Sequence, residues 1–141
     1  NKINFDTLDF DPSSIEYANF HHPTPDCYLG GTVTAIVRAL RSTGASGDAI
    51  MGLQARAFAS GDTIDQAFGT AATATLTVTS ADKFYDIAIG AFTPAGSPVG
   101  GQTMFYQMYR DATAGGDNFG SDLRVVEVAL EFNCGRFGSD A

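Results

Sequence analysis

Apolar and polar residues alternate with a period of two along most of this chain, whereas a helical period of 3.6 is nearly absent. Between Thr73 and Thr79, threonine occupies every second position, and Ala74, Leu76 and Val78 fill the positions between. A segment of this kind forms a strand with one buried face and one β-branched face toward water. The pattern therefore predicts an all-β protein.

Eight segments carry strand patterns, and turns rich in glycine, proline, serine and aspartate separate them. The expected strands cover residues 4–10, 15–20, 32–40, 49–59, 72–80, 84–92, 102–110 and 123–132. One short helical turn is expected over 62–68, because Asp62 can cap its start and Ile64 and Phe68 lie four residues apart.

Eight short antiparallel strands are typical of a two-sheet sandwich, and a jelly-roll-like arrangement is the first choice. An immunoglobulin-like sandwich and a lipocalin-like barrel are the alternatives, although the chain lacks the tryptophan of the immunoglobulin pattern. At this length the chain is expected to form a single β-sandwich domain over 1–141. Within it, 1–20 is a candidate N-terminal arm, and 133–141 is expected to be a loose tail.

The charge balance argues against two classes of partner. Sixteen acidic residues outnumber eight basic ones, which gives a formal net charge of −8. Nucleic acid and anionic membranes both attract basic surfaces, so neither is expected as a partner. No apolar run approaches the length of about 18 residues that a membrane-spanning helix needs, so no such span is predicted.

Cys27 and Cys134 are the only two cysteines. Two interpretations stay open: a pair of free, half-buried thiols, or one disulfide that ties the first core strand to the C-terminal tail. A disulfide across so long a loop would stabilise the fold by roughly 4–5 kcal/mol in the chain-entropy model. No Cys/His cluster surrounds either cysteine, so a zinc site is not expected.

Arg110 ends an apolar strand and leads into a glycine- and aspartate-rich loop. A guanidinium at such a position needs a carboxylate partner, and Asp117 and Asp122 are the candidates. Together with Asp111, these residues are expected to form a structural salt bridge that fastens the loop to the sheet.

The same loop offers a weak candidate site for calcium, formed by Asp111, Asp117, Asn118 and Asp122. Their spacing does not match an EF-hand. The more ordinary interpretation is that these side chains cap turns by accepting hydrogen bonds from nearby backbone N–H groups. We therefore predict no metal and no cofactor.

No catalytic constellation stands out. His21 and His22 are adjacent, so on a strand they would point to opposite faces and could not readily share a metal ion. Glu127 and Glu131 lie four residues apart on one strand face, which separates them by roughly 13 Å. This exceeds the spacing of about 5–9.5 Å between the carboxylates of glycosidases. The chain also lacks nucleophile-elbow and phosphate-loop motifs, and we predict that it is not an enzyme.

Exposed aromatic and proline residues are candidates for contacts between subunits, because aromatic side chains often anchor interfaces and edge strands invite pairing. The expected assembly contacts are Phe5, Phe10, Tyr17, Phe20, Pro94 and Pro98. Exposed tyrosines could instead stack on sugars, so a glycan is a second expected type of ligand.

Three stretches carry a resemblance to a known family. They are LDFDPSSIEYANFHHPTPDCYLGGTVTAIVRAL, ASGDAIMGLQARAFASGDTIDQAFGT and FYQMYRDATAGGDNFGSDLRVVEVALEF. In their order and local motifs, from Leu8 to Phe132, they resemble small jelly-roll structural proteins of tailed bacteriophages. The Arg-Asp-Ala motif at 110–112, followed by Asp117 and Asp122, is the most specific part. Met51 departs from the pattern, where the family often has tryptophan.

The resemblance implies a non-enzymatic building block of a virion, such as a capsid decoration, head-fibre or tail-associated protein. It further implies self-assembly into a homo-oligomer, contacts with other virion proteins, and a location in the virion or outside the cell. Two alternatives remain open. One is a carbohydrate-binding β-sandwich module. The other is a subunit of an extracellular filament, assembled by donor-strand exchange through segment 1–20.

Overall fold

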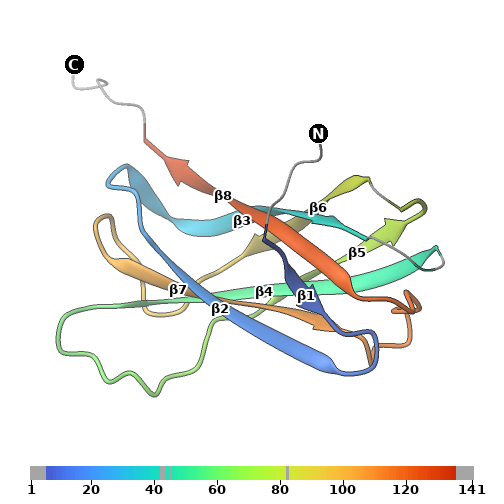
Figure 1. Ribbon diagram of the computed structural model, residues 1–141. Coiled ribbons are helices and arrows are strands. Elements are labelled where there is room, and N and C mark those ends of the chain that lie inside the picture. The colour runs from blue at the N-terminus through green and yellow to red at the C-terminus, as the bar shows by residue number, and fades with distance from the viewer. Residues whose placement is uncertain (1–5, 42–43, 45, 82, 136–141) are drawn as a thin grey trace.

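The computed structural model describes residues 6–41, 44, 46–81 and 83–135, and this part of the chain contains eight strands and no helix (Figure 1). The strands are β1 (Leu8–Phe10), β2 (Ile15–Pro23), β3 (Tyr28–Leu40), β4 (Gly47–Phe58), β5 (Ala72–Val78), β6 (Phe84–Phe92), β7 (Thr103–Asp111) and β8 (Leu123–Cys134). They form two antiparallel sheets of four strands each. The predicted all-β sandwich is thus confirmed.

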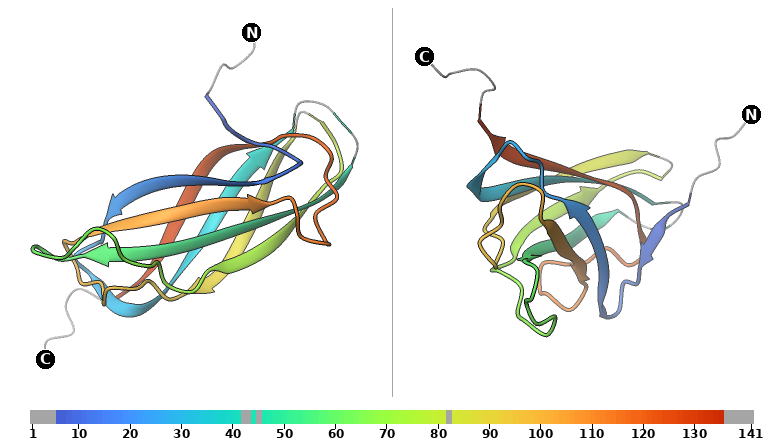
Figure 2. Two further views of the ribbon diagram at one scale, coloured as in Figure 1. Left: turned by 90° about the horizontal axis from the view of Figure 1, so that it is seen from below. Right: turned by 90° about the vertical axis from the view of Figure 1, so that its left-hand side faces the viewer.

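The pairing of the strands is nested. β1 pairs with β8, β2 with β7, β3 with β6, and β4 with β5. Two further pairings, β3 with β8 and β4 with β7, join these ribbons into sheets of order β1-β8-β3-β6 and β2-β7-β4-β5. A folded-back ribbon that rolls into two packed sheets has the jelly-roll topology. Figure 2 shows the two layers from two further directions.

The core lies between the two sheets and follows the alternation of the sequence. Along β3, Val33, Ala35, Val37 and Ala39 are buried while the residues between them are half-exposed. Buried alanines on β3 and β4 leave room for larger side chains on the facing strands, as side chains of two packed sheets interdigitate. The largest buried apolar side chains are Tyr106, Phe10, Phe119, Met51, Leu53, Ile89 and Met104.

The N-terminal strands differ from the expected bounds. β1 begins at Leu8, and the described residues before it, Asp6 and Thr7, form no β pairing. Residues 4 and 5 of the expected strand lie outside the described part of the chain. By contrast, β2 runs on through His21 and His22 to Pro23. The two histidines therefore lie on this strand, which was expected to end at residue 20. Within the candidate arm over 1–20, residues 8–10 pair with β8 in one sheet and residues 15–20 pair with β7 in the other.

The predicted helical turn over 62–68 is wrong, since these residues form part of an irregular loop that connects β4 to β5. Bonds to the rest of the fold replace the helical ones. The Asp62 carboxylate accepts a hydrogen bond at 2.8 Å from the backbone N–H of Ala59, a residue that precedes the expected helical turn. The Arg56 guanidinium donates a hydrogen bond to the carbonyl of Ala67 at 2.7 Å. Tertiary contacts thus override a weak local preference for helix.

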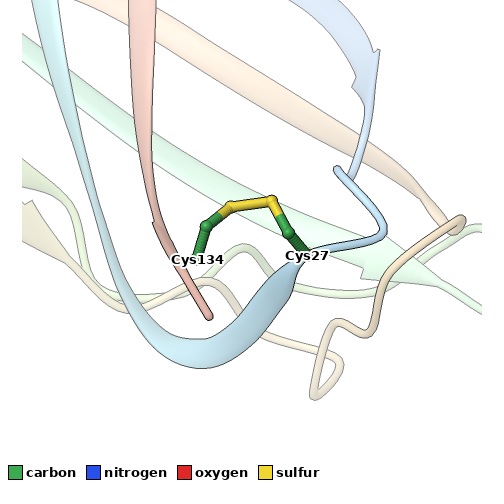
Figure 3. Close-up of a disulfide and its surroundings, with 2 residues drawn as sticks. All are labelled: Cys27 and Cys134. Atoms are coloured by element: carbon green, nitrogen blue, oxygen red, sulfur yellow. A yellow bond between two sulfur atoms is a disulfide. The ribbon is translucent and has the colours of Figure 1, made fainter. Parts of the chain in front are cut away.

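The structure pairs Cys27 and Cys134 in a disulfide, with a Cα–Cα distance of 4.8 Å (Figure 3). β3 and β8 are neighbours in one sheet, and Tyr28 lies opposite Cys134 in their register. Just beyond, Gly30 and Gly31 have φ angles of +87° and +91°, which side-chain-bearing residues rarely adopt. The two glycines let β3 turn sharply away from the disulfide before it joins the core.

Candidate functional site

The two outer faces of the sandwich differ in chemistry. On the β1-β8-β3-β6 sheet, Arg38 bonds to Asp86 on β6 at 2.8 Å and to Glu127 on β8 at 3.2 Å. The hydrogen bond from Arg38 lowers the pKa of the Asp86 carboxyl below its usual value. Arg124 and Asp9 form another exposed pair at 3.3 Å. Paired, exposed charges of this kind are typical of a solvated surface.

The central part of the other outer face carries rings and amides instead. The register of β2, β7 and β4 places Asn19 opposite Gln107, and Gln107 opposite Gln54. The Gln54 Nε2 donates to Gln107 Oε1 at 2.7 Å, and Gln107 Nε2 donates to Asn19 Oδ1 at 3.2 Å. Three side-chain amides are thus linked in a chain across three strands. Such a chain fixes the direction in which each terminal amide points.

Aromatic pairs flank the amide chain on both sides. Toward one end, Tyr17 and Tyr109 lie with ring centroids 5.5 Å apart. The Tyr109 ring covers Gly52, since a Cβ at Gly52 would lie 2.1 Å from Tyr109 Cζ. Toward the other end, the His21 and Phe105 ring centroids are 5.7 Å apart. We call this surface the amide–aromatic strip, formed by Tyr17, Asn19, His21, Gln54, Arg56, Phe105, Gln107 and Tyr109.

A groove of about 420 Å³ opens where the strip meets the loop between β4 and β5. The loop swings away from the sandwich at the end of β4 (Figure 1). Residues from β2, β4, β7 and the loop line the groove: Asn19, Arg56, Phe58, Ile64, Gln66, Phe68, Phe105 and Tyr106. This β4–β5 groove has the size, the apolar walls and the few polar groups that are typical of ligand sites.

Arg56 positions the wall of the β4–β5 groove. Its guanidinium lies 5.4 Å from the centroid of the Phe58 ring, and it donates to the Ala67 carbonyl and to Gln66 Oε1. Behind the loop, the Gly69 N–H donates to the Ala55 carbonyl at 3.0 Å. These bonds hold the second half of the loop against β4. The Arg56 Nε is buried and has no hydrogen-bond partner among the described residues.

A second feature lies along one side of the sandwich, between β2 and β8. β1 pairs only with Leu123–Val125, so the same edge of β8 from Val126 to Cys134 has no ladder partner in the described chain. Beside this edge is a gap of about 470 Å³ between the two sheets. Its apolar lining comes from Leu8, Phe20, Met108, Val125, Val126, Val128 and Leu130. We call this feature the β8 edge gap.

Arg110 lies on the inner side of β7 and is fully buried. Its Nε and Nη2 donate to the two oxygens of Asp117 at 3.0 and 2.8 Å. The same guanidinium donates to the carbonyls of Ser121, at 2.8 Å, and of Phe119. Of the two expected partners, Asp117 contacts Arg110, whereas Asp122 is exposed. The guanidinium therefore joins the loop to the sheet.

Protein donors already bind side-chain oxygens of three of the four candidate calcium residues, whereas the fourth, Asp122, is exposed. Asp117 Oδ2 also accepts from the Ile50 N–H at 2.9 Å, and Asn118 Oδ1 accepts from the Asp48 N–H at 2.7 Å. Asp111 Oδ1 accepts from Thr113. Over the described ranges, no three histidine, cysteine, aspartate or glutamate side chains are grouped so that they could hold a metal ion. The side chains of this loop therefore cap its turns and bind backbone N–H groups of β4.

The residues expected at assembly contacts are scattered. Tyr17 is 58% exposed on the amide–aromatic strip, and Phe20 is half-buried, stacked on Tyr106 at 4.9 Å. Phe10 is 1% exposed, and Pro94 is also buried, so neither is available to a partner in the folded chain. Pro98 is half-buried in the loop between β6 and β7, which also contains Pro94, and Phe5 lies outside the described residues.

Sequence reasoning missed the β4–β5 groove. At every second position, two of the expected strands carry both aromatic and polar side chains. These are Phe105, Gln107 and Tyr109 on one strand, and Gln54, Arg56 and Phe58 on the other. That alternation could have marked two chemically unusual outer faces. Only the register between β4 and β7 shows that they form one surface, with Phe105 opposite Arg56.

No helix in the described part of the chain is long and apolar enough to cross a membrane. Comparison with protein-family models, curated proteins and solved structures gave no match for this chain.

Proposed function

We propose that this chain is a non-enzymatic structural subunit of a virus-like particle or appendage, such as a capsid decoration, head-fibre or tail-associated protein, that acts by self-assembly. The β8 edge gap is the observation that supports this proposal most directly. A free strand edge next to exposed apolar side chains is a template for one more strand. The resemblance to jelly-roll proteins of tailed bacteriophages supports the choice of a virion over other assemblies.

Two features of the β8 edge gap favour a strand from a second copy of the chain. The free edge of β8, from Val126 to Cys134, is about as long as β2 or β7. The inward-facing residues Val128, Leu130 and Phe132 along it are only half-buried, although they pack on the core. An added strand would bond to the free N–H and C=O groups and cover these side chains.

A matched pair of lysine substitutions on β8 tests the proposal. Val128 faces the β8 edge gap, whereas its neighbour Ala129 lies on the outer face and is exposed. We expect the unmodified chain to form oligomers in size-exclusion chromatography with light scattering, and rings or fibres in negative-stain images. Val128→Lys should be monomeric, because a charge in the gap opposes burial, and Ala129→Lys should assemble normally.

Circular dichroism and thermal unfolding establish that both variants fold. An unmodified chain that stays monomeric at every concentration, and does not associate with a particle or filament, would contradict the proposal. Equal assembly of the two lysine variants would instead place the contact elsewhere on the molecule.

A further inference from the structure

The β4–β5 groove shares no lining residue with the β8 edge gap, and only His21 of the amide–aromatic strip also lines that gap, so what the groove binds can be argued separately from assembly. We propose that this groove and the adjoining amide–aromatic strip bind an uncharged oligosaccharide. A sugar ring presents an apolar face of C–H groups and a rim of hydroxyls. Its site therefore needs exposed rings or aliphatic side chains next to groups that both donate and accept hydrogen bonds.

The apolar half of this requirement is met by side chains that the fold leaves uncovered. Phe105 is 40% exposed although it contacts His21 and, edge to face, Phe58. Ile64, on the opposite wall, is 89% exposed. Two large apolar side chains that face one groove from a strand and from a loop are suited to holding the two sides of a flat ligand.

The polar half comes from amides that are fixed but not saturated. The chain of bonds from Gln54 through Gln107 to Asn19 leaves Asn19 Nδ2 and Gln54 Oε1 without a partner among the described side chains and backbone. Arg56 Nε is also unpartnered and buried at the groove. The free Asn19 Nδ2 can donate to a ligand hydroxyl, and the free Gln54 Oε1 can accept from one.

The charges around the groove favour a neutral ligand over an acidic one. Among the described residues that line the groove, Arg56 alone is charged, and both of its Nη groups are already bonded to the loop. None of these described lining residues is a carboxylate, although the chain carries a net charge of −8. A cationic ligand thus has no counter-charge there, and an anionic one meets an overall acidic molecule.

The length of the strip favours a chain of sugars. Phe105 and Tyr109 lie four residues apart on β7, which corresponds to about 13 Å along the strand. The amide chain runs across the strip between them. A ligand seated against Phe105 can therefore continue past Gln107 toward the Tyr17–Tyr109 pair.

Native gels that contain a soluble polysaccharide test this inference. The probes are the neutral polymers dextran, mannan, xylan, laminarin and galactan, with alginate and hyaluronan as acidic ones. We expect at least one neutral polymer to slow the migration of the unmodified chain. Phe105→Ala should weaken that retardation about tenfold or more, because truncation of a central aromatic usually removes much of the binding energy.

Two further variants separate binding from folding. Asn19→Ala removes an exposed amide at the edge of the sheet, so it should reduce retardation without changing the melting temperature. Phe84→Ala is the matched control, since Phe84 is 56% exposed but lies on the other sheet, and it should migrate like the unmodified chain. Retardation by none of the neutral polymers, retardation by the acidic ones alone, or unchanged binding by Phe105→Ala would each overturn the inference.

Discussion

Arg110 determines the shape of a whole loop from inside the protein. Its guanidinium is 0% exposed, and the carboxylate of Asp117 that it binds is 2% exposed. Three backbone carbonyls, from Phe10, Phe119 and Ser121, accept the remaining hydrogen bonds. The group therefore satisfies carbonyls that would otherwise be buried without donors. The Phe119 ring lies 5.4 Å from the guanidinium and covers it.

Asp117→Asn should destabilise the protein strongly. The substitution leaves the Arg110 charge buried without its counter-charge, and breaking a buried ion pair costs about 3–5 kcal/mol. Urea unfolding followed by circular dichroism measures this change. Asp122→Asn is the matched control, because Asp122 lies in the same loop but is exposed, and its free energy of unfolding should change little. Equal effects of the two substitutions would contradict the role given to Arg110.

Among the elements, the disulfide acts where β3 begins and β8 ends. It joins strands that are adjacent in the sheet but separated by 107 residues in the sequence. Cys27 also accepts a backbone hydrogen bond from Gly135 at 3.1 Å, so the end of β8 is fastened twice. In the chain-entropy model, most of the stabilisation arises because the bond restricts the unfolded chain.

Reduction of this disulfide should lower the free energy of unfolding by up to about 4–5 kcal/mol. Urea unfolding with and without a reductant measures the difference. The double variant Cys27→Ser/Cys134→Ser should match the reduced protein and show no response to the reductant. If the oxidised, reduced and doubly substituted proteins all unfolded at the same urea concentration, the bond would contribute no net stability.

The loop between β4 and β5 shows where local sequence signals stop being informative. A capping aspartate and two apolar residues four positions apart predict a helical turn, yet Arg56 and the Ala55 carbonyl hold the segment in another shape. Those partners come from a neighbouring strand, so no window over 62–68 contains them. The sequence offered Asp117 and Asp122, both close in the chain, as partners of Arg110. It did not indicate that Gln66 and Ile64 would line a groove with Phe105, which is distant in the chain.

For the whole molecule, the strand positions were predictable and the pairing was not. Alternation at Thr73–Thr79 or Val33–Ala39 marks a strand because burial repeats every second residue. Nothing in that alternation says that β3 pairs with both β6 and β8. The β4–β5 groove and the β8 edge gap both arise from pairing, so neither could be located before the register was known.

The stability of the whole fold should fall at alkaline pH. Burial raises the pKa of the Tyr106, Tyr28 and Tyr109 hydroxyls above the usual value of 10.0. A tyrosine whose pKa is higher in the folded state than in the unfolded state contributes fully to stability below about pH 10. This contribution is lost as the pH rises through the folded-state pKa. Tyr85 acts in the opposite sense, because a hydrogen bond with Thr79 lowers its pKa.

Tyr106→Phe isolates the largest part of this effect. The Tyr106 hydroxyl is buried and has no hydrogen-bond partner among the described residues. Its removal should leave stability at pH 7 unchanged or raise it by about 1 kcal/mol. The decline of the free energy of unfolding above about pH 10 should become shallower. Urea titrations at several pH values compare the two proteins, and an unchanged pH dependence would contradict the assignment.

The nested pairing of the strands has a consequence for synthesis of the chain on the ribosome. β1 and β2 emerge before the other six strands of the sandwich, whereas their partners β8 and β7 are made after all the others. Of the nested pairs, only β4 and β5 join strands that are consecutive in the chain. Pairing between distant segments is slow, and the exposed edges are prone to aggregate while they wait. The sheet that contains β1, β3 and β6 therefore cannot be completed until β8 has left the exit tunnel.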